Sequence, residues 1–313
     1  MVRMLPILSG IRFPKLKLYF EQLPEGIEIF GVHLAFHGIL VAIALILGLI
    51  AAQWQAKRTK QQPELYLDFA LYAIPFSFVG ARVFYVIFRW NDFRGNIWEI
   101  FNVRDGGLAM YGAIIAALMT GWVYSKIKKV SFALLADTAI VGLLTGQVIG
   151  RIGNFFGREG FGTYTDSVFA MQIAQSDAGV DFLCTIQNLA ERYTGQERLF
   201  LKLLEIREKT VIIDGIRYIQ VHPVFLYEII WNLCLLILLF IYTKYKKFDG
   251  EILLLYLFGY GLGRVWMETL RIDRLFLWRT QISASQCMAA ISVVATLLLL
   301  IIGWKRTYDK KKY

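Results

Sequence analysis

The sequence is short of charged residues, cysteine and histidine, and each shortage excludes a class of protein. Charged side chains make up 19% of the 313 residues, hydrophobic ones make up 57%, and the mean hydropathy is +0.51. An ordinary soluble fold of this length is more polar, so that class is excluded. The three cysteines are odd in number and widely spaced, which favours neither a disulfide framework nor a metal signature. His33 and His37 lie one helical turn apart, but no third ligand has suitable spacing, so we expect no metal and no cofactor.

Long apolar runs are what the sequence has in abundance. Mostly apolar windows occur near residues 31–54, 67–88, 107–125, 132–156, 222–243, 251–268 and 283–303. Each is long enough for a helix that crosses a hydrocarbon core of roughly 30 Å. The sequence therefore predicts an all-α polytopic membrane protein with seven transmembrane helices and a small extracytoplasmic α+β head.

The basic residues indicate an orientation. The net charge is +10, and the lysines and arginines gather after alternate windows, at residues 57–60, 126–129, 244–247 and 305–312. By the positive-inside rule this pattern places the N-terminus outside and the C-terminus in the cytoplasm, and it explains the charge better than a nucleic-acid partner does. No basic region with a small-residue cleavage site precedes the first window, so we expect the N-terminal segment to be retained.

Five regions follow from these boundaries. They are an N-terminal extracytoplasmic amphipathic segment (1–30), spans one to four (31–156), an extracytoplasmic head (157–221), spans five to seven (222–304) and a basic cytoplasmic tail (305–313). Within the head we expect a short strand at 168–173, a charged helical stretch at 186–209 and a hairpin at 211–219 that turns at Asp214-Gly215.

Ionisable residues stand near the outer ends of several windows, where their cost in a membrane indicates a function. Arg151 lies some nineteen residues into its span, roughly 28 Å from the cytoplasmic end, and Asn154 follows. Arg264, Glu268 and Arg271 recur at i, i+4 and i+7, so they share a helical face on which Arg264 can pair with Glu268. Arginine binds phosphate in a fixed fork, so the pattern favours an anionic phospholipid as ligand.

A structural interpretation of the same residues stays open. Arginines near helix ends often extend to the interface or pair with a carboxylate, and this applies most to Arg82 and Arg271. The glycines at 142, 146 and 150, and at 259, 261 and 263, are typical of close helix packing.

Taken together, the motifs resemble those of the bacterial phosphatidylglycerol–prolipoprotein diacylglyceryl transferases. The matching segments are Gly80-Ala81-Arg82, residues 106–112, residues 150–156 with Glu159 and Gly162, His222-Pro223 with Leu226-Tyr227-Glu228, and residues 259–261 followed by Arg264, Glu268, Arg271 and Asp273. The resemblance implies a seven-helix body in the bacterial cell membrane. It also implies transfer of the diacylglyceryl group of phosphatidylglycerol to the lipobox cysteine of a prolipoprotein, with release of glycerol phosphate. The nucleophilic sulfur then comes from the substrate.

The resemblance implies roles for Arg151, Asn154, Gly162 and Arg264, and side-chain chemistry adds further candidates. The expected catalytic residues are Arg151, Arg264, Asn154, Tyr111, Glu159, Glu268 and His37. The expected substrate-binding residues are Arg151, Arg264, Gly162, Arg82, Arg271, His222 and Tyr227. The two arginines Arg151 and Arg264 would neutralise the departing phosphate, and Glu159 or Glu268 would orient an arginine or accept the thiol proton.

Three positions depart from the family pattern. Tyr111 stands where some members carry a histidine, and His37 stands where a tyrosine is usual. Gly157 replaces a common asparagine. We hypothesise that His37 supplies proton-accepting capacity. Two alternatives remain at this stage: a lipid or anion transporter or channel, because intramembrane arginines also line anion pathways, and an inactive paralogue that binds lipoprotein precursors.

Overall fold

The computed structural model describes residues 2–4, 7–103, 106–178, 197–272 and 282–312. The chain forms two compact units, and each is described by itself. The first unit comprises Met1–Leu47, Leu143–Lys244 and Leu254–Tyr313. The second comprises Gly48–Gly142 and Tyr245–Leu253.

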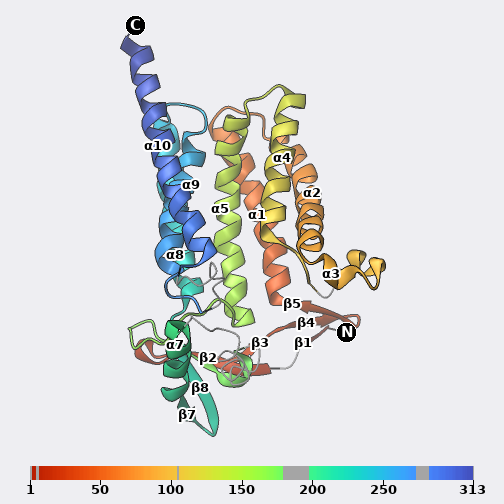
Figure 1. The fold of residues 1–313 in the computed structure, drawn as a ribbon, viewed down its shortest axis with the longest axis vertical. Helices are drawn as coiled ribbons and strands as arrows, with labels where there is room; N and C mark the ends of the chain where they lie inside the picture. Colours follow the sequence, from red (N-terminus) through yellow and green to blue (C-terminus); the bar gives the residue numbers. More distant parts are fainter. Residues whose placement is uncertain (1, 5–6, 104–105, 179–196, 273–281, 313) are drawn as a thin grey trace. The chain divides into compact units, whose positions relative to one another are not determined.

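Each of the seven apolar windows holds a helix in the part of the chain that the structure describes (Figure 1). The helices are α1 (Phe36–Arg58), α2 (Glu64–Phe88), α4 (Met110–Lys128), α5 (Phe132–Gly157), α8 (Val224–Tyr242), α9 (Glu251–Met267) and α10 (Ala284–Lys312). Among the described residues, α1, α2, α5, α8 and α10 are long and apolar enough to cross a membrane. The helix α9 has only 17 residues, and α4 carries two lysines in its last turn. A membrane-spanning character is thus supported for five of the seven predicted spans.

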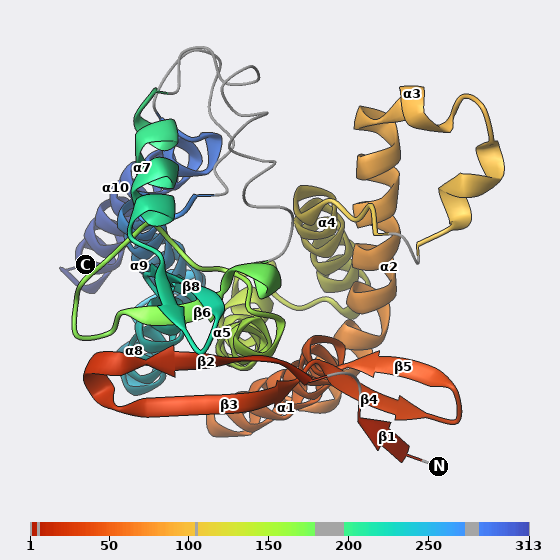
Figure 2. The same cartoon turned by 90° about the horizontal axis from the view of Figure 1, so that it is seen from below.

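The first unit also contains two antiparallel sheets (Figure 2). The strands are β1 (Val2–Met4), β2 (Ile7–Phe13), β3 (Leu18–Pro24), β4 (Gly26–Ile29), β5 (Val32–Ala35), β6 (Met171–Ala174), β7 (Val211–Ile213) and β8 (Ile216–Val221). Their orders are β1-β4-β5 and β3-β2-β6-β8-β7. The short helices are α3 (Trp90–Phe93), α7 (Glu197–Glu208), η1 (Pro14–Leu16), η2 (Ile97–Phe101), η3 (Gln175–Asp177) and η4 (Thr243–Tyr245).

The N-terminal strands differ from the separate amphipathic segment and the all-α body that the sequence predicts. Strand β2 pairs with β6, and Ile11 lies opposite Ile173. Ile11, Phe13 and Leu23 are buried in the same hydrophobic core as Ile173. The sheet partner lies far along the chain, and for that reason the local sequence pattern does not reveal it. Strands β2 and β3 therefore belong to the same sheet as β6, β8 and β7, and this sheet extends the head beyond 157–221.

The rest of the head agrees well with the sequence. The turn between β7 and β8 places Asp214 at φ 51° and Gly215 at φ 79°, the left-handed pair that a type I′ hairpin requires. The strand predicted at 168–173 is observed at Met171–Ala174. Helix α7 falls inside the predicted helical stretch 186–209, and its residues Leu203 and Ile206 are buried in the head core. The start of that stretch and Cys184 lie outside the described residues.

The second unit is a helical body in which α2 and α4 pack closely. Gly80 and Gly112 allow this approach, because a Cβ atom on Gly80 would lie 2.8 Å from the carbonyl oxygen of Gly112. Tyr66, Tyr124 and Leu135 form a separate buried cluster in this unit. Gly142 is one of the glycines that the sequence predicts to allow close helix packing. It lies at such a contact, because a Cβ atom on Gly142 would lie 2.5 Å from the carbonyl oxygen of Gly48.

Candidate functional site

Three arginines of the first unit meet at one buried carboxylate. Glu228 lies in the second turn of α8, and its side chain is 7% exposed. Its Oε2 atom lies 2.8 Å from Nη1 of Arg151, and its Oε1 atom lies 3.1 Å from Nη1 of Arg264 and 3.6 Å from Nη1 of Arg271. Side chains from α5, α8, α9 and the segment after α9 therefore converge at one point. We call Arg151, Glu228, Arg264 and Arg271 the arginine cluster.

A second carboxylate fixes Arg264 from the other side. Oε2 of Glu268 lies 3.1 Å from Nη2 of Arg264, so the predicted i, i+4 pair is confirmed. The Ser283 hydroxyl donates a hydrogen bond of 3.0 Å to Oε1 of Glu268. Glu268 and Ser283 are almost fully buried, and buried charges need such partners. The guanidinium of Arg264 is thus held between two carboxylates.

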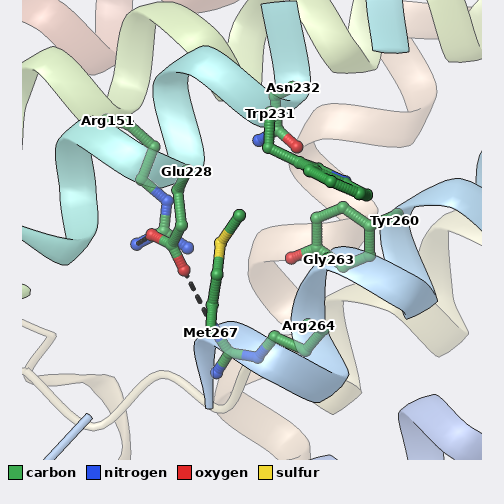
Figure 3. A pocket seen from close by; sticks show the side chains of 8 residues that line it. All are labelled: Arg151, Glu228, Trp231, Asn232, Tyr260, Gly263, Arg264 and Met267. Atoms are coloured by element: carbon green, nitrogen blue, oxygen red, sulfur yellow. Dashed lines mark hydrogen bonds and ion pairs between the residues drawn. The ribbon is translucent and has the colours of Figure 1, made fainter. Parts of the chain in front are cut away.

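A small pocket opens beside the arginine cluster (Figure 3). It is lined by Arg151, Glu228, Trp231, Asn232, Tyr260, Gly263, Arg264 and Met267. Figure 3 shows the guanidinium of Arg151 against the carboxylate of Glu228, with the rings of Trp231 and Tyr260 across the pocket. The Arg151 side chain is 27% exposed, and among the described residues Glu228 is its one polar partner. The remaining donors of Arg151 are therefore available to a ligand.

The aromatic wall of this pocket, formed by Trp231 and Tyr260, depends on a close approach between α8 and α9. The Trp231 indole N–H donates to the carbonyl oxygen of Gly259 at 3.0 Å. A Cβ atom on Gly263 would lie 2.3 Å from the Nε1 atom of Trp231. Glycine at position 263 is therefore what lets the indole ring lie flat against α9.

The segment after α5 is built around the predicted residues Asn154 and Gly162. The carbonyl oxygen of Asn154 accepts a hydrogen bond from the backbone N–H of Glu159, and its side chain lies against Gly160. The N–H of Gly162 donates to the carbonyl oxygen of His222 at 2.8 Å. A Cβ atom on Gly162 would lie 2.6 Å from the carbonyl oxygen of Leu270. Both residues shape the backbone next to the cluster.

Arg158, which the sequence analysis does not single out, anchors this segment. It adopts φ 53° immediately after α5, and it is 2% exposed. Its guanidinium donates to the carbonyl oxygens of Phe156 at 3.0 Å and of Leu23 at 2.9 Å, and it pairs with Asp177 at 3.4 Å. The end of α5 is thereby tied to the N-terminal strands.

His222 and Tyr227 contact each other beside the cluster. The Nδ1 atom of His222 lies 3.1 Å from the Tyr227 hydroxyl. The Tyr227 ring stacks on Trp266 and meets Phe169 edge to face. Burial, with a smaller contribution from Lys202, lowers the pKa of His222 below its ordinary value of 6.5.

The other predicted residues of the first unit lie at the end of α5. His37 packs against Gly153, because a Cβ atom there would lie 3.1 Å from the His37 Nδ1 atom. That Nδ1 atom is buried and has no hydrogen-bond partner among the described residues. Glu159 is exposed and forms no ion pair with any described residue, so of the two predicted carboxylates it is Glu268 that orients an arginine.

Arg82 and Tyr111 belong to the second unit, so the structure does not place them relative to the arginine cluster. Arg82 is 9% exposed, and its guanidinium donates to the carbonyl oxygens of residues 99, 100, 102, 106 and 107. These bonds hold the loop between α2 and α4. Tyr111 is 38% exposed at the start of α4. Their roles toward a substrate stay predictions.

The central position of Glu228 is what the sequence analysis missed. The sequence motif includes this residue, but it was not expected to be a site residue. Glu228 is the one ionisable carboxylate in the apolar helix α8, and a lone ionisable residue in such a helix indicates a functional site. The pocket residues Trp231 and Tyr260 carry no such signal, because aromatic side chains are common near membrane interfaces.

Comparisons with known proteins identify relatives along most of the chain. The family model described as prolipoprotein diacylglyceryl transferase matches residues 24–302. The phosphatidylglycerol–prolipoprotein diacylglyceryl transferase of Clostridioides difficile is 32% identical over 86% of this chain and 91% of its own length. Proteins with the same name from Listeria welshimeri (33% identical, 89% of this chain and 88% of theirs) and Finegoldia magna (32% identical, 90% and 96%) are similarly related.

Proposed function

The chain belongs to the prolipoprotein diacylglyceryl transferase family, and on that premise we propose that it transfers the diacylglyceryl group of phosphatidylglycerol to the lipobox cysteine of a prolipoprotein. The chain is a transferase of lipoprotein maturation, and its relatives are named for the same two substrates. Glycerol phosphate is the leaving group.

One observation carries the assignment of the site. Arg151 and Arg264 come from different helices, and both contact Glu228, at 2.8 Å and 3.1 Å. Two guanidinium groups that converge on one carboxylate can also bind a phosphodiester, to which each presents its donors in a fixed fork. We therefore propose that the phosphate of phosphatidylglycerol binds beside the pocket, where it competes with Glu228 for these donors.

The proposed reaction is a displacement at carbon. The substrate thiolate forms a sulfur–carbon bond to the diacylglyceryl carbon that carries the phosphate. The carbon–oxygen bond breaks, and glycerol phosphate leaves with the electron pair. The two arginines stabilise the negative charge of this leaving group, and the same positive field favours thiolate over thiol. The chain's own residues thus supply charge and position, and the nucleophile comes from the protein substrate.

Further residues have supporting roles in this proposal. Glu268 orients Arg264 through their 3.1 Å pair, while Asn154 and Gly162 hold the backbone beside Arg151.

His37 accepts the thiol proton, since its buried Nδ1 atom has no partner among the described residues. Replacing His37 with Phe should reduce turnover about a hundredfold. His33→Phe, at an exposed position, is the control, and equal turnover in both variants at every pH would refute the role of His37.

The proposal includes a membrane arrangement. We propose that all seven helices cross the bacterial cell membrane, with the N-terminus and the head outside and the C-terminus in the cytoplasm. The basic clusters at residues 57–60, 126–129, 244–247 and 305–312 support this orientation. The partners are the lipid bilayer, phosphatidylglycerol and a prolipoprotein lipobox peptide, and no nucleic acid is involved.

The function is tested with purified protein, phosphatidylglycerol and a lipobox peptide. Mass spectrometry should detect a peptide that carries diacylglycerol in a thioether link. A peptide with serine in place of its cysteine should give no product, and the Arg151→Ala variant should give almost none. Absence of product with the wild-type protein in its native lipids would contradict the proposed function.

A further inference from the structure

Strand β3 forms an unpaired edge of the five-stranded sheet. The strand runs from Leu18 to Pro24 and pairs on one side with β2. No strand or backbone hydrogen bond from the described residues occupies its other side. Alternate N–H and C=O groups of β3 therefore point away from the sheet, in a row that an extended polypeptide can pair with.

The first half of this edge is apolar and exposed. Leu18, Tyr19 and Phe20 are consecutive, and they are 49%, 54% and 39% exposed. Exposed edges in proteins are usually blocked by charges, proline or shortness. Strand β3 carries one charge, that of the exposed Glu21 at its centre, and proline stands at its end, so Leu18, Tyr19 and Phe20 form the uncharged half of the edge. The opposite edge, β7, has only three residues.

The edge is connected to the arginine cluster through α5. The Phe20 ring meets the ring of Phe155 edge to face, with centroids 5.3 Å apart. Phe155 lies one helical turn after Arg151. The buried Arg158 side chain then ties the carbonyl oxygen of Leu23, near the end of β3, to the end of α5. A segment paired with β3 would therefore lie on a rigid support next to the helix that carries Arg151.

The hairpin that supplies this edge lies outside the part of the chain that resembles the family model. The match to that model begins at residue 24, whereas β2 and most of β3 precede this residue. The buried side chains of the hairpin, Ile11, Phe13 and Leu23, complete the head core.

We propose that β3 binds the prolipoprotein substrate as an added β-strand, next to the cysteine that is modified. This inference rests on the proposed function. A polypeptide that presents a cysteine to a narrow pocket must be extended there, and backbone pairing binds an extended chain of any sequence.

The test is a scan of lipobox peptides in which one backbone nitrogen at a time is methylated. Pairing with β3 predicts that KM for the peptide rises about tenfold at every second methylated position, because only alternate N–H groups face the strand. The KM for phosphatidylglycerol should stay constant. A scan without this two-residue period would overturn the proposal. If the unmethylated peptide gives no product, the proposed function fails instead.

A matched pair of variants locates the binding strand. Tyr19→Glu places a charge on the β3 edge, and Ile212→Glu places the same charge on the β7 edge, where Ile212 is 66% exposed. Tyr19→Glu should raise KM for the peptide about tenfold with little change in kcat, and Ile212→Glu should leave it unchanged. Equal effects of the two variants, or a parallel rise in KM for phosphatidylglycerol, would contradict a peptide site. A third outcome would also contradict it: the wild-type protein is a dimer, and Tyr19→Glu dissociates the dimer without changing KM for the peptide. In that case β3 pairs with a second copy of the chain.

Discussion

At the scale of single residues, Glu228 determines the charge balance of the arginine cluster. It contacts three guanidinium groups, and its side chain is 7% exposed. Glu228→Gln keeps the shape of the side chain but removes its charge, so the arginines lose their shared partner and repel one another. We expect a loss of about 3–5 kcal/mol in the free energy of unfolding, as for a broken buried ion pair. Thermal unfolding in lipid measures it.

The control for Glu228 is an exposed ion pair of the same type. Glu205 pairs with Lys209 at 3.0 Å, and both side chains are nearly half exposed. Glu205→Gln should leave the free energy of unfolding almost unchanged, because water screens the pair. Similar losses in the two variants would show that the buried position of Glu228 has no special importance.

His222 gives the stability a specific pH dependence. Its pKa in the folded chain is lowered by burial, while in the unfolded chain it is close to 6.5. The folded chain therefore binds this proton less readily than the unfolded chain, so stability is complete above pH 6.5 and declines as the pH falls below it. His222→Gln should remove this part of the decline. Unfolding temperatures at pH 7.5 and 5.5 provide the measurement, and an equal decline in wild type and variant would contradict it.

At the scale of secondary-structure elements, the contact between α8 and α9 positions the aromatic wall of the pocket. Gly263→Ala would bring a Cβ atom to 2.3 Å from Trp231, which must then rotate and lose its hydrogen bond to Gly259. We expect a loss of about 1–3 kcal/mol in stability and reduced transfer activity. Gly150→Ala is the matched control, since a Cβ atom there meets nothing within 4 Å. Wild-type activity in Gly263→Ala would contradict the role of this contact.

The sequence predicts the helices far better than the sheet. Apolar windows locate the seven long helices α1, α2, α4, α5, α8, α9 and α10, because helical periodicity and membrane length are local properties. The pair Arg264–Glu268 is equally local and was predictable. The pairing of β2 with β6 depends on two segments far apart in the sequence, as does the meeting of Arg151 with Glu228. Such contacts arise from the tertiary fold, so no window of the sequence contains them.

At the scale of the whole molecule, the proposed orientation makes a prediction about access from the two sides of the membrane. In a chain whose three native cysteines are replaced by serine, Tyr19→Cys should react with an impermeant maleimide added outside intact cells. Lys305→Cys should react only after the membrane is made permeable, because the proposed orientation puts the basic tail in the cytoplasm. The opposite labelling pattern would invert the topology and place the arginine cluster at the wrong surface for translocated substrates.

The central claim is that guanidinium groups from α5 and α9 hold a lipid phosphate. The most direct measurement is the Kd for phosphatidylglycerol of the wild type, Arg151→Gln, Arg264→Gln and the control Arg217→Gln, which removes an exposed charge from the head. Losing one charge-assisted contact should raise Kd about tenfold or more in the first two variants and leave the control unchanged. Diacylglycerol, which lacks the phosphate, should bind all four proteins equally. A Kd for phosphatidylglycerol that is the same in all four would contradict the account.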